Sequence, residues 1–334
     1  MALSLTACGG GEKPGGSASS SGRSSGSAGD SASAPDVPEL DKSEAPDRSV
    51  QQPDKSQPAA SEPQQPPKPA VSAEMTYTFD AATGTLTCSG GGEINIDDWV
   101  EVVKNTIFET DGYKCRKEVK KAVIEDGITA LGEEAFGATA ITEIIIPDSV
   151  TRIVQSAFHD TQITSVSIPD SVTELGGSIF AYCPNLSRVT LPQNLTVIPE
   201  RMFIGCTSLT SIQIPESVTT IEKYAFSKCG LTSVTIPDGV MSIGDFAFEE
   251  CPLTQLTLPS SVTDWKPNAL RYCNSLTDLT FLGDTDVDHV KKWVDNFLGE
   301  KTITIHAPAG SVIEGYVNCQ ISENGAACKF APIG

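Results

Sequence analysis

The sequence predicts a repeat solenoid of short stacked β-strands joined by short helical or irregular returns, with a cap at each end and a disordered N-terminal tail. One unit of 22 or 23 residues recurs along the middle of the chain, and its clearest copy begins at Leu231. The first six residues of this copy alternate apolar and polar side chains and end at Pro237, which is the pattern of a half-buried strand. A fixed period of this length is typical of solenoids, because one repeat cannot bury its apolar edge alone.

The charge of the chain narrows the class of partner. The chain carries 23 Lys and Arg residues against 43 Asp and Glu residues, which gives a net charge of −20. Such a charge repels nucleic-acid phosphates and anionic lipid headgroups, so we expect no nucleic-acid partner. No apolar run reaches the roughly 18 residues that a membrane span requires. We therefore expect membrane contact only through a lipid.

Residues 1–8 resemble the end of a bacterial lipoprotein signal peptide. The run Leu5-Thr6-Ala7-Cys8 looks like the lipobox of that family, in which the cysteine is acylated on sulfur and becomes the mature N-terminus. The resemblance implies lipidation at Cys8 and a location on the outer face of the bacterial membrane. Little apolar sequence and no basic segment precede the box, so we expect the natural start codon upstream of Met1. The alternative is a chance Leu-Thr-Ala-Cys in a cytosolic protein.

Residues 9–74 are expected to form a disordered tether. They are rich in Gly and Ser up to about Ala34, and then rich in Pro, Gln, Ser, Glu and Lys, with almost no large apolar residues. Such a segment cannot offset the entropy cost of ordering by burial. A flexible coil of this length would average roughly 45 Å from end to end, which could hold the folded part away from a membrane.

Residues 75–118 are predicted to cap the first repeat. Two alternating segments, 77–80 and 85–88, flank a turn and predict a β-hairpin, and residues 97–103 predict a short helix. The run Gly90-Gly91-Gly92 lacks the Gly-x-x-x-x-Gly-Lys spacing of a phosphate-binding loop, so we interpret it as a turn.

Residues 119–282 hold the repeats, which we expect to form eight coils stacked about 4.8 Å apart. A proline ends the first strand of the coils at Pro147, Pro169, Pro192, Pro215, Pro237 and Pro259. A phenylalanine lies on the return at Phe136, Phe158, Phe180, Phe203, Phe226 and Phe248, and Leu270 takes the next place. Equivalent side chains should therefore form interior columns.

The repeat unit reads Leu-Thr-x-Val-x-Ile-Pro-x-x-Val-Thr-x-Ile-x-x-x-Ala-Phe-x-x-Cys, and in this it resembles the BspA-like leucine-rich repeats. The resemblance covers residues 75–334, because segments 85–90 and 303–311 also look like the terminal segments of that family. It implies the leucine-rich repeat fold and a bacterial surface protein. Some members act as adhesins on host or matrix proteins, and many have no assigned partner.

Residues 283–334 are predicted to hold an inserted amphipathic helix and the C-terminal cap. Apolar residues between 287 and 298 follow helical spacing, residues 302–306 predict a strand, and residues 311–316 predict a cap helix. Residues 329–332 are then expected to cover the edge that the last strand would otherwise expose.

The segment from Asp284 to Asp288 has the opening alternation of a calcium loop. His289 stands where such a loop needs glycine, and Asp295 stands where it needs a bidentate glutamate. We therefore favour a solvated helix start over a calcium site, and we expect no metal.

Five cysteines keep the repeat period and are expected to be buried core residues. They are Cys183, Cys206, Cys229, Cys251 and Cys273. Thiols stacked in a line cannot converge on a tetrahedral zinc ion, and buried thiols behave as small apolar groups. In the caps, two pairs are candidate disulfides outside the cytosol: Cys88 with Cys115, and Cys319 with Cys328.

The sequence gives no reason to expect an enzyme, a cofactor or catalytic residues. Its three histidines, His159, His289 and His306, lie in different settings. The one Gly-x-Ser-x-Gly match, Gly22 to Gly26, lies in the Gly- and Ser-rich tail and not between a strand and a helix, so it is no nucleophile elbow, and no His-Glu-x-x-His pair is present.

The outward residues of the first strands are the candidate binding face. They are Glu143, Ile145, Ser165, Ser167, Arg188, Thr190, Ser211, Gln213, Ser233, Thr235, Gln255, Thr257, Asp278 and Thr280. We expect a lipid-anchored, monomeric cell-surface protein that uses this face to bind protein or glycan partners without catalysis. The alternative is a structural or assembly component of the cell envelope without a host ligand.

Overall fold

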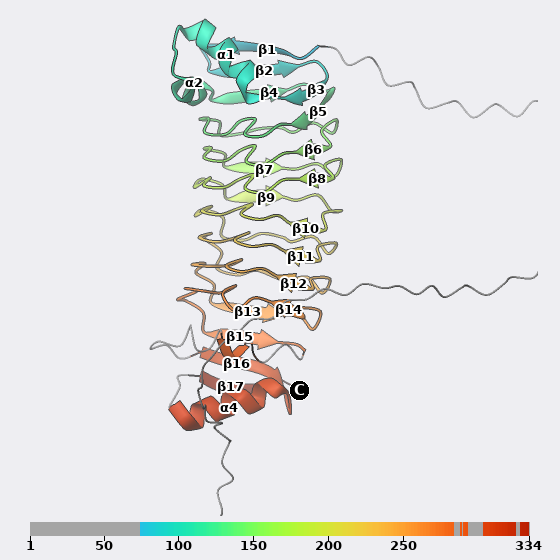
Figure 1. Cartoon of the computed structure of the whole chain (residues 1–334), viewed down its shortest axis with the longest axis vertical. Helices are drawn as coiled ribbons and strands as arrows, with labels where there is room; N and C mark the ends of the chain where they lie inside the picture. The colour runs from blue at the N-terminus through green and yellow to red at the C-terminus, as the bar shows by residue number, and fades with distance from the viewer. Residues whose placement is uncertain (1–73, 284–287, 289, 293–302, 325–327, 334) are drawn as a thin grey trace, which may run out of the picture. The chain divides into compact units, whose positions relative to one another are not determined.

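The computed structural model describes residues 74–283, 288, 290–292, 303–324 and 328–333. The predicted lipobox at 1–8 and the predicted tether, except for Glu74, lie outside these residues. Most of the predicted calcium segment and most of the inserted helix also lie outside them. Within the described residues, the repeats form coils that stack one above the next, so the predicted solenoid is confirmed (Figure 1).

The predicted hairpin opens the N-terminal cap. Strands β1 (Thr76–Asp80) and β2 (Thr85–Ser89) pair antiparallel. The Asp80 carboxylate accepts hydrogen bonds from Ala82 N at 2.9 Å and Thr83 Oγ1 at 2.7 Å, and Gly84 takes a left-handed φ of 67°. These are the features that let a short polar segment reverse the chain.

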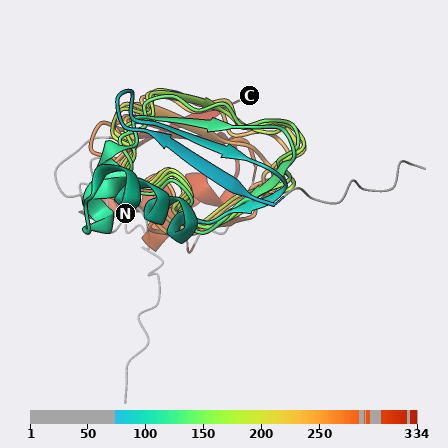
Figure 2. The ribbon, with the colours of Figure 1, turned by 90° about the horizontal axis from the view of Figure 1, so that it is seen from above.

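Two helices complete this cap. Helix α1 (Ile96–Ile107) is longer than predicted and buries Trp99, whose Nε1 donates to Ala135 O at 2.7 Å. Helix α2 (Gly112–Glu118) was not predicted, because its seven residues carry little apolar pattern; the Asp111 carboxylate caps it by accepting from two backbone amides. Viewed from above, the helices lie to one side of the outline of the coils (Figure 2).

Each coil presents two short extended segments. The first strands are β4 (Lys121–Ile124), β7 (Ser165–Ser167), β9 (Arg188–Thr190), β13 (Gln255–Leu258) and β15 (Asp278–Phe281). The second strands are β3 (Gly92–Ile94), β5 (Ile128–Leu131), β6 (Arg152–Ile153), β8 (Glu174–Leu175), β10 (Val197–Ile198), β11 (Thr220–Ile221), β12 (Ser242–Ile243) and β14 (Asp264–Trp265). Pairing between coils is parallel, as the prediction of stacked repeats requires.

The returns are hydrogen-bonded turns and contain no helix in the described repeats. Their backbone donors bond to the next coil: Ser156 N donates to Gly177 O at 3.0 Å, and Phe158 N donates to Ile179 O at 2.9 Å. Left-handed residues such as Ser156, with a φ of 60°, interrupt any helical run. The helical form of the predicted return is therefore wrong, and the irregular form is correct.

The phenylalanines of the returns form the predicted interior column. From Phe136 to Phe248, successive rings lie 5.4–5.8 Å apart with interplanar angles of 6–9°, and all of them are fully buried. Stacked rings of this kind bury a large apolar area in one fixed geometry. The column therefore ties each coil to the next.

The repeat cysteines form a second interior column. Each thiol donates to the backbone carbonyl of a phenylalanine in the preceding coil, at 3.0–3.1 Å. Burial raises the pKa of Cys273 to about 12 and holds the pKa of Cys229 well above its usual value, so these thiols remain protonated donors. Their predicted burial in the core is confirmed.

The C-terminal cap continues the parallel sheet. Strands β16 (Ile303–Pro308) and β17 (Cys328–Ile333) follow β15, as predicted for residues 302–306 and 329–332. Helix α4 (Val312–Asn324) runs well beyond the predicted end at residue 316. It begins after Ser311, whose Oγ accepts from Glu314 N at 3.3 Å.

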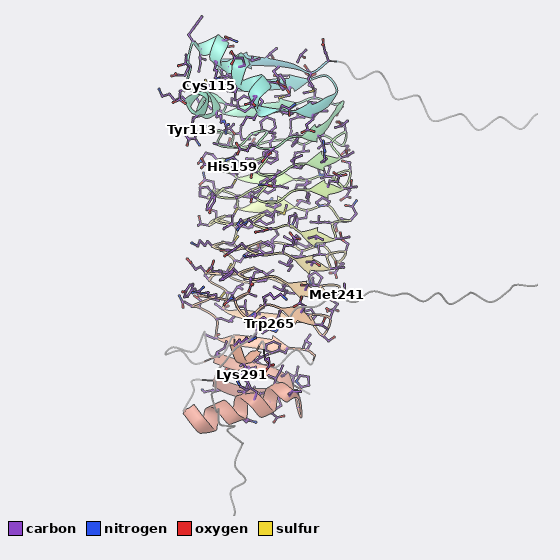
Figure 3. The ribbon with its side chains drawn as sticks, in the orientation of Figure 1. Tyr113, Cys115, His159, Met241, Trp265 and Lys291 are labelled. Carbon is purple, nitrogen blue, oxygen red and sulfur yellow. The ribbon has the colours of Figure 1, made fainter. Side chains whose placement is uncertain are left out.

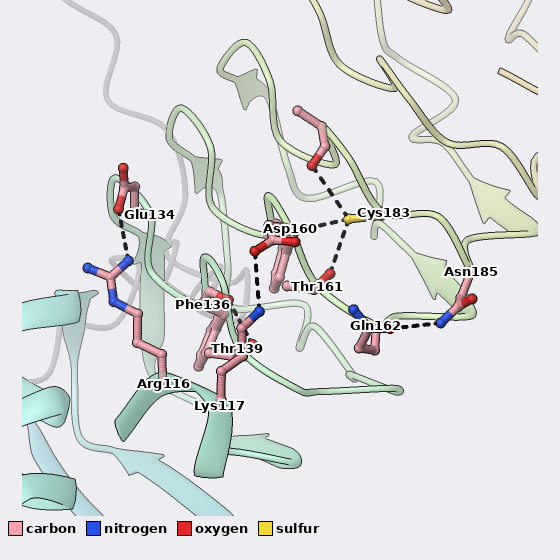
Figure 4. A network of polar contacts seen from close by, with 12 residues as sticks. Arg116, Lys117, Glu134, Phe136, Thr139, Asp160, Thr161, Gln162, Cys183 and Asn185 are labelled. Atoms are coloured by element: carbon pink, nitrogen blue, oxygen red, sulfur yellow. Dashed lines mark hydrogen bonds and ion pairs between the residues drawn. The ribbon is translucent and has the colours of Figure 1, made fainter. Parts of the chain in front are cut away.

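Polar side chains join the N-terminal cap to the first coils. Arg116 pairs with Glu134 at 3.1 Å, and Lys117 pairs with Asp160 at 3.2 Å. Both pairs are drawn in Figure 4. Both pairs are partly exposed, so each contributes less than about 1 kcal/mol to stability. They link α2 to two neighbouring coils. Among the described residues, no helix is both long and apolar enough to cross a bilayer.

Candidate functional site

The predicted binding face forms a row of outward side chains on the first strands. Its residues alternate with buried ones because successive side chains of a strand point to opposite faces. Twelve of the fourteen predicted residues are exposed, and Asp278 and Thr280 are half-buried. The parallel register stacks equivalents directly, as in the pairs Ser165 with Arg188 and Gln255 with Asp278. The row therefore presents two outward positions per coil, most of them polar.

The sheet under this row is interrupted twice, between β4 and β7 and again between β9 and β13. In the second interruption, the segments around residues 209–214 and 231–236 form no strand, although Leu231 begins the clearest sequence copy. Here the backbone bonds from Thr232 N to Thr210 O and from Thr254 N to Thr232 O are 3.2 and 3.3 Å long. Ile212 and Val234 are half-buried, as is the equivalent Val189 of β9, whereas the equivalent Leu256 is 2% exposed.

A second surface was missed by sequence reasoning. On the returns, the Tyr224 and Phe246 rings stack at 4.8 Å, and the Arg201 guanidinium lies 5.1 Å from the Tyr224 ring. The Arg271 guanidinium lies 5.7 Å from the Phe246 ring and 4.6 Å from the Tyr272 ring. These five side chains form a continuous stack of cations and aromatic rings, which we call the aromatic–cation stack.

The signal for this stack was present in the sequence. Tyr224 and Phe246 stand two residues before the repeat phenylalanine, where earlier coils carry Ser156 and Ser178. All four residues have a φ between 57° and 60°, a conformation that bulky side chains rarely adopt. Serine at this position in two earlier coils indicates an ordinary polar surface, whereas tyrosine and phenylalanine are residue types that contribute strongly to binding interfaces.

The histidines do not assemble a catalytic site in the described residues. His159 is half-buried on a return near the N-terminal cap, and its Nδ1 lies 2.9 Å from Ser156 O (Figure 3). His306 Nε2 lies 3.0 Å from Asp278 Oδ1, and Thr277 Oγ1 donates to the other oxygen of Asp278. The carboxylate therefore separates the hydroxyl from the imidazole, which is the reverse of the order that activates a nucleophile. His289 lies outside the described residues.

Other predicted sites have different outcomes. The described part of the chain contains no group of three or more metal-ligating side chains that could hold an ion.

Cys88 and Cys115 are buried free thiols, so the candidate disulfide between them is not formed. Cys88 points into the core, where burial raises its pKa to about 12, whereas Cys115 Sγ donates to Glu109 O at 3.9 Å. Cys8, most of the Asp284–Asp288 segment, and the side chains of Cys319 and Cys328 lie outside the described residues.

The repeat period and the observed coils agree with a known family of sequences. The family model described as the BspA type leucine-rich repeat region matches residues 106–219 and 196–305, in six copies. The chain belongs to this family. The BspA-type repeats therefore account for most of the described coils, and the resemblance found in the sequence is confirmed.

Several solved structures match the BspA-type chain at low sequence identity. A leucine-rich repeat protein from Bacteroides ovatus is 19% identical, with a TM-score of 0.52, covering 80% of this chain and 77% of its own. A T. pallidum leucine-rich repeat protein is 20% identical, with a TM-score of 0.40, covering 78% of this chain and 97% of its own. A leucine-rich cell surface protein from Faecalibacterium prausnitzii is 24% identical, with a TM-score of 0.31, covering 53% of this chain and 56% of its own. The likeness to the Bacteroides ovatus structure shows a common fold.

No curated protein matches the sequence.

Proposed function

We propose that this BspA-type protein is a lipid-anchored bacterial surface protein that binds protein or glycan partners without catalysis. The observation that carries the proposal is the row of outward side chains on the first strands. It presents two outward side chains per coil, mostly short hydroxyls and amides, so one extended partner meets similar chemistry repeatedly. Repeated weak contacts can add up to strong binding through effective concentration.

The family supports a location on the bacterial surface, and the sequence supports the anchor. Cys8 follows a lipobox-like run and precedes a long polar segment. A single lipid chain binds membranes only weakly, whereas two or more chains hold a protein stably. Diacylation at Cys8 followed by a tether would therefore place the coils outside the cell.

Crosslinking on intact cells tests partner binding. Variants Ser233→Arg and Gln255→Arg place bulky charge on the row, and Thr263→Arg places the same charge on an exposed position of the second-strand side. We expect the two row variants to lose crosslinked partners at least tenfold and the control to retain them. Equal capture by all three variants contradicts the use of this face.

Two further measurements separate the proposal from its alternative. Mass spectrometry and membrane partition should show an acyl mass that disappears in Cys8→Ala. Deletion of the protein should reduce adhesion to matrix proteins or glycans. If deletion instead alters envelope integrity without changing adhesion, the protein is a structural component of the envelope.

A further inference from the structure

The ladder formed by the second strands is interrupted at one place, between β8 and β10. On the N-terminal side, Thr173 N donates to Thr151 O at 2.9 Å. On the C-terminal side, Thr219 N donates to Thr196 O at 2.8 Å. Between these coils, where every residue is described, no backbone hydrogen bond joins segment 173–175 to segment 196–199. We call this interruption the β8–β10 seam; the two strands lie in neighbouring coils in Figure 1.

Pro199 is the cause of the seam. In the other coils, the residue that follows the second strand donates its backbone N–H to the preceding coil at 2.8–3.0 Å. These residues are Gly132, Val154, Gly176, Glu222, Gly244 and Lys266. Pro199 stands at the same position and has no N–H, so the carbonyl of Leu175 loses its donor.

The seam exposes apolar side chains that are buried in the other coils. Leu175 is half-buried, whereas its equivalents Leu131, Ile153, Ile198, Ile221, Ile243 and Trp265 are at most 1% exposed. Leu195 is also half-buried, whereas its equivalents Val150, Val172, Val218, Val240 and Val262 are at most 4% exposed. These two leucines form an apolar floor open to solvent.

A groove of about 620 Å³ lies over this floor. Its volume falls within the range of small-molecule sites. One end of the seam is closed by a hydrogen bond from Asn194 Nδ2 to Asp170 O at 3.1 Å. The other end is closed by a hydrogen bond from Ser178 N to Glu200 O at 2.8 Å. An extended peptide strand could not be inserted between the coils without breaking these bonds.

The polar groups around the groove select the chemistry of its ligand. Glu174 and Glu222 place exposed carboxylates beside the groove, and Glu222 Oε2 also accepts a hydrogen bond from Glu200 N at 2.8 Å. The cation that lines the groove, Arg152, is paired with Glu93. The groove therefore disfavours anions. Along the seam, backbone carbonyls accept and backbone amides donate, so a ligand must offer both kinds of group together with an apolar face.

We propose that the β8–β10 seam is a binding groove for a neutral hexopyranose glycan. Sugar hydroxyls both donate and accept, so they can pair with the carbonyls of Thr173 and Leu175, the amides of Thr196 and Val197, and the carboxylate of Glu174. The C–H face of the ring packs on Leu175 and Leu195. This site deepens the proposed binding function, rests on it, and is separate from the first-strand row.

Saturation-transfer NMR on the full chain tests the groove with maltohexaose, cellohexaose and mannohexaose, and with a polygalacturonate oligomer as the anionic counterpart. We expect at least one neutral glycan to bind and the anionic one not to bind. Pro199→Val restores the donor that other coils have, as at Val154, so it should close the seam and weaken binding at least tenfold. Glu174→Ala changes an exposed side chain, leaves the fold intact, and should also weaken binding, whereas Thr263→Ala, at an exposed position outside both the row and the groove, should leave it within twofold.

The proposal is overturned if the wild-type chain binds none of the neutral glycans. It is also overturned if Pro199→Val and Glu174→Ala both bind as the wild type does, or if the anionic oligomer or an extended peptide binds the seam instead. Loss of cellular partners in the row variants, with no glycan bound at the seam, leaves the proposed function standing and removes only the groove.

Discussion

The phenylalanine column and the second-strand ladder run through the same coils, but only the column is continuous across the β8–β10 seam. The rings of Phe180 and Phe203, which lie in the two coils at the seam, remain stacked at 5.8 Å, the widest spacing in the column. A backbone hydrogen bond contributes about 1 kcal/mol net, whereas a buried phenylalanine contributes several. The two coils at the seam are also joined by the pairing of β7 with β9 and by backbone bonds between the returns. The comparison teaches that the coils stay in register through these contacts and the ring column while the second-strand pairing is given up to open a groove.

Removing a ring from the column tests this comparison most strongly. Phe226 lies 5.4 Å from both Phe203 and Phe248 and is fully buried. Phe226→Ala should lower the free energy of unfolding by about 3–5 kcal/mol, because it leaves a cavity between two rings. Urea denaturation followed by circular dichroism measures the change. A loss below about 1 kcal/mol would mean that the column does not hold the coils together.

Two leucines sharpen the comparison at an intermediate scale. Leu209 is fully buried in the segment 209–214, which is equivalent to a first strand, whereas Leu195 is half-buried at the seam. Leu209→Ala should cost about 2–5 kcal/mol, and Leu195→Ala about 1–2 kcal/mol because its side chain already contacts water. The same denaturation experiment compares them. Equal losses would show that Leu195 is packed as tightly as the other apolar residues and that the seam is closed.

The smallest effect concerns the C-terminal end of the stack. Hydrogen bonds from His306 and Thr277 lower the pKa of Asp278 below its usual value of 3.8. A carboxyl group whose pKa is lower in the folded state stabilises the protein at a pH above its pKa in the unfolded state. This stabilisation is lost as the pH falls through its pKa in the folded state. Asp278→Asn should therefore cost less than about 1 kcal/mol at neutral pH, since the pair is partly exposed. The difference from wild type should vanish at low pH; a constant difference from pH 7 to pH 2 would assign the effect to packing.

The regular parts of the fold could be predicted because the same sequence pattern recurs in each coil. The proline and phenylalanine spacings fix the coil length, and the alternation around Leu231 separates buried from exposed residues. The hairpin of the cap and the strand at residues 303–306 carry equally clear local patterns. A period shared by many copies outweighs the ambiguity of any single one.

The features that depart from the repeat could not be predicted in the same way. The returns share the sequence of short helices, but their N–H groups bond to the next coil, which is a tertiary effect. Pro199 and Tyr224 each occupy a position at which the residue type varies from coil to coil. Only the stacked coils show that Pro199 removes a donor and that Tyr224 joins Arg201 and Phe246 in the aromatic–cation stack.

Amide hydrogen exchange at single-residue resolution tests the central claim, that Pro199 opens the ladder while the columns keep the coils stacked. The amides of Thr196 and Val197 should exchange at least about 100-fold faster than those of Thr219 and Glu222, which donate to the preceding coil at 2.8 and 3.0 Å. In Pro199→Val, the amides at the seam should gain protection while those of Thr219 and Glu222 remain unchanged. Equal protection of all four amides in the wild-type chain would contradict an open seam and the groove that depends on it.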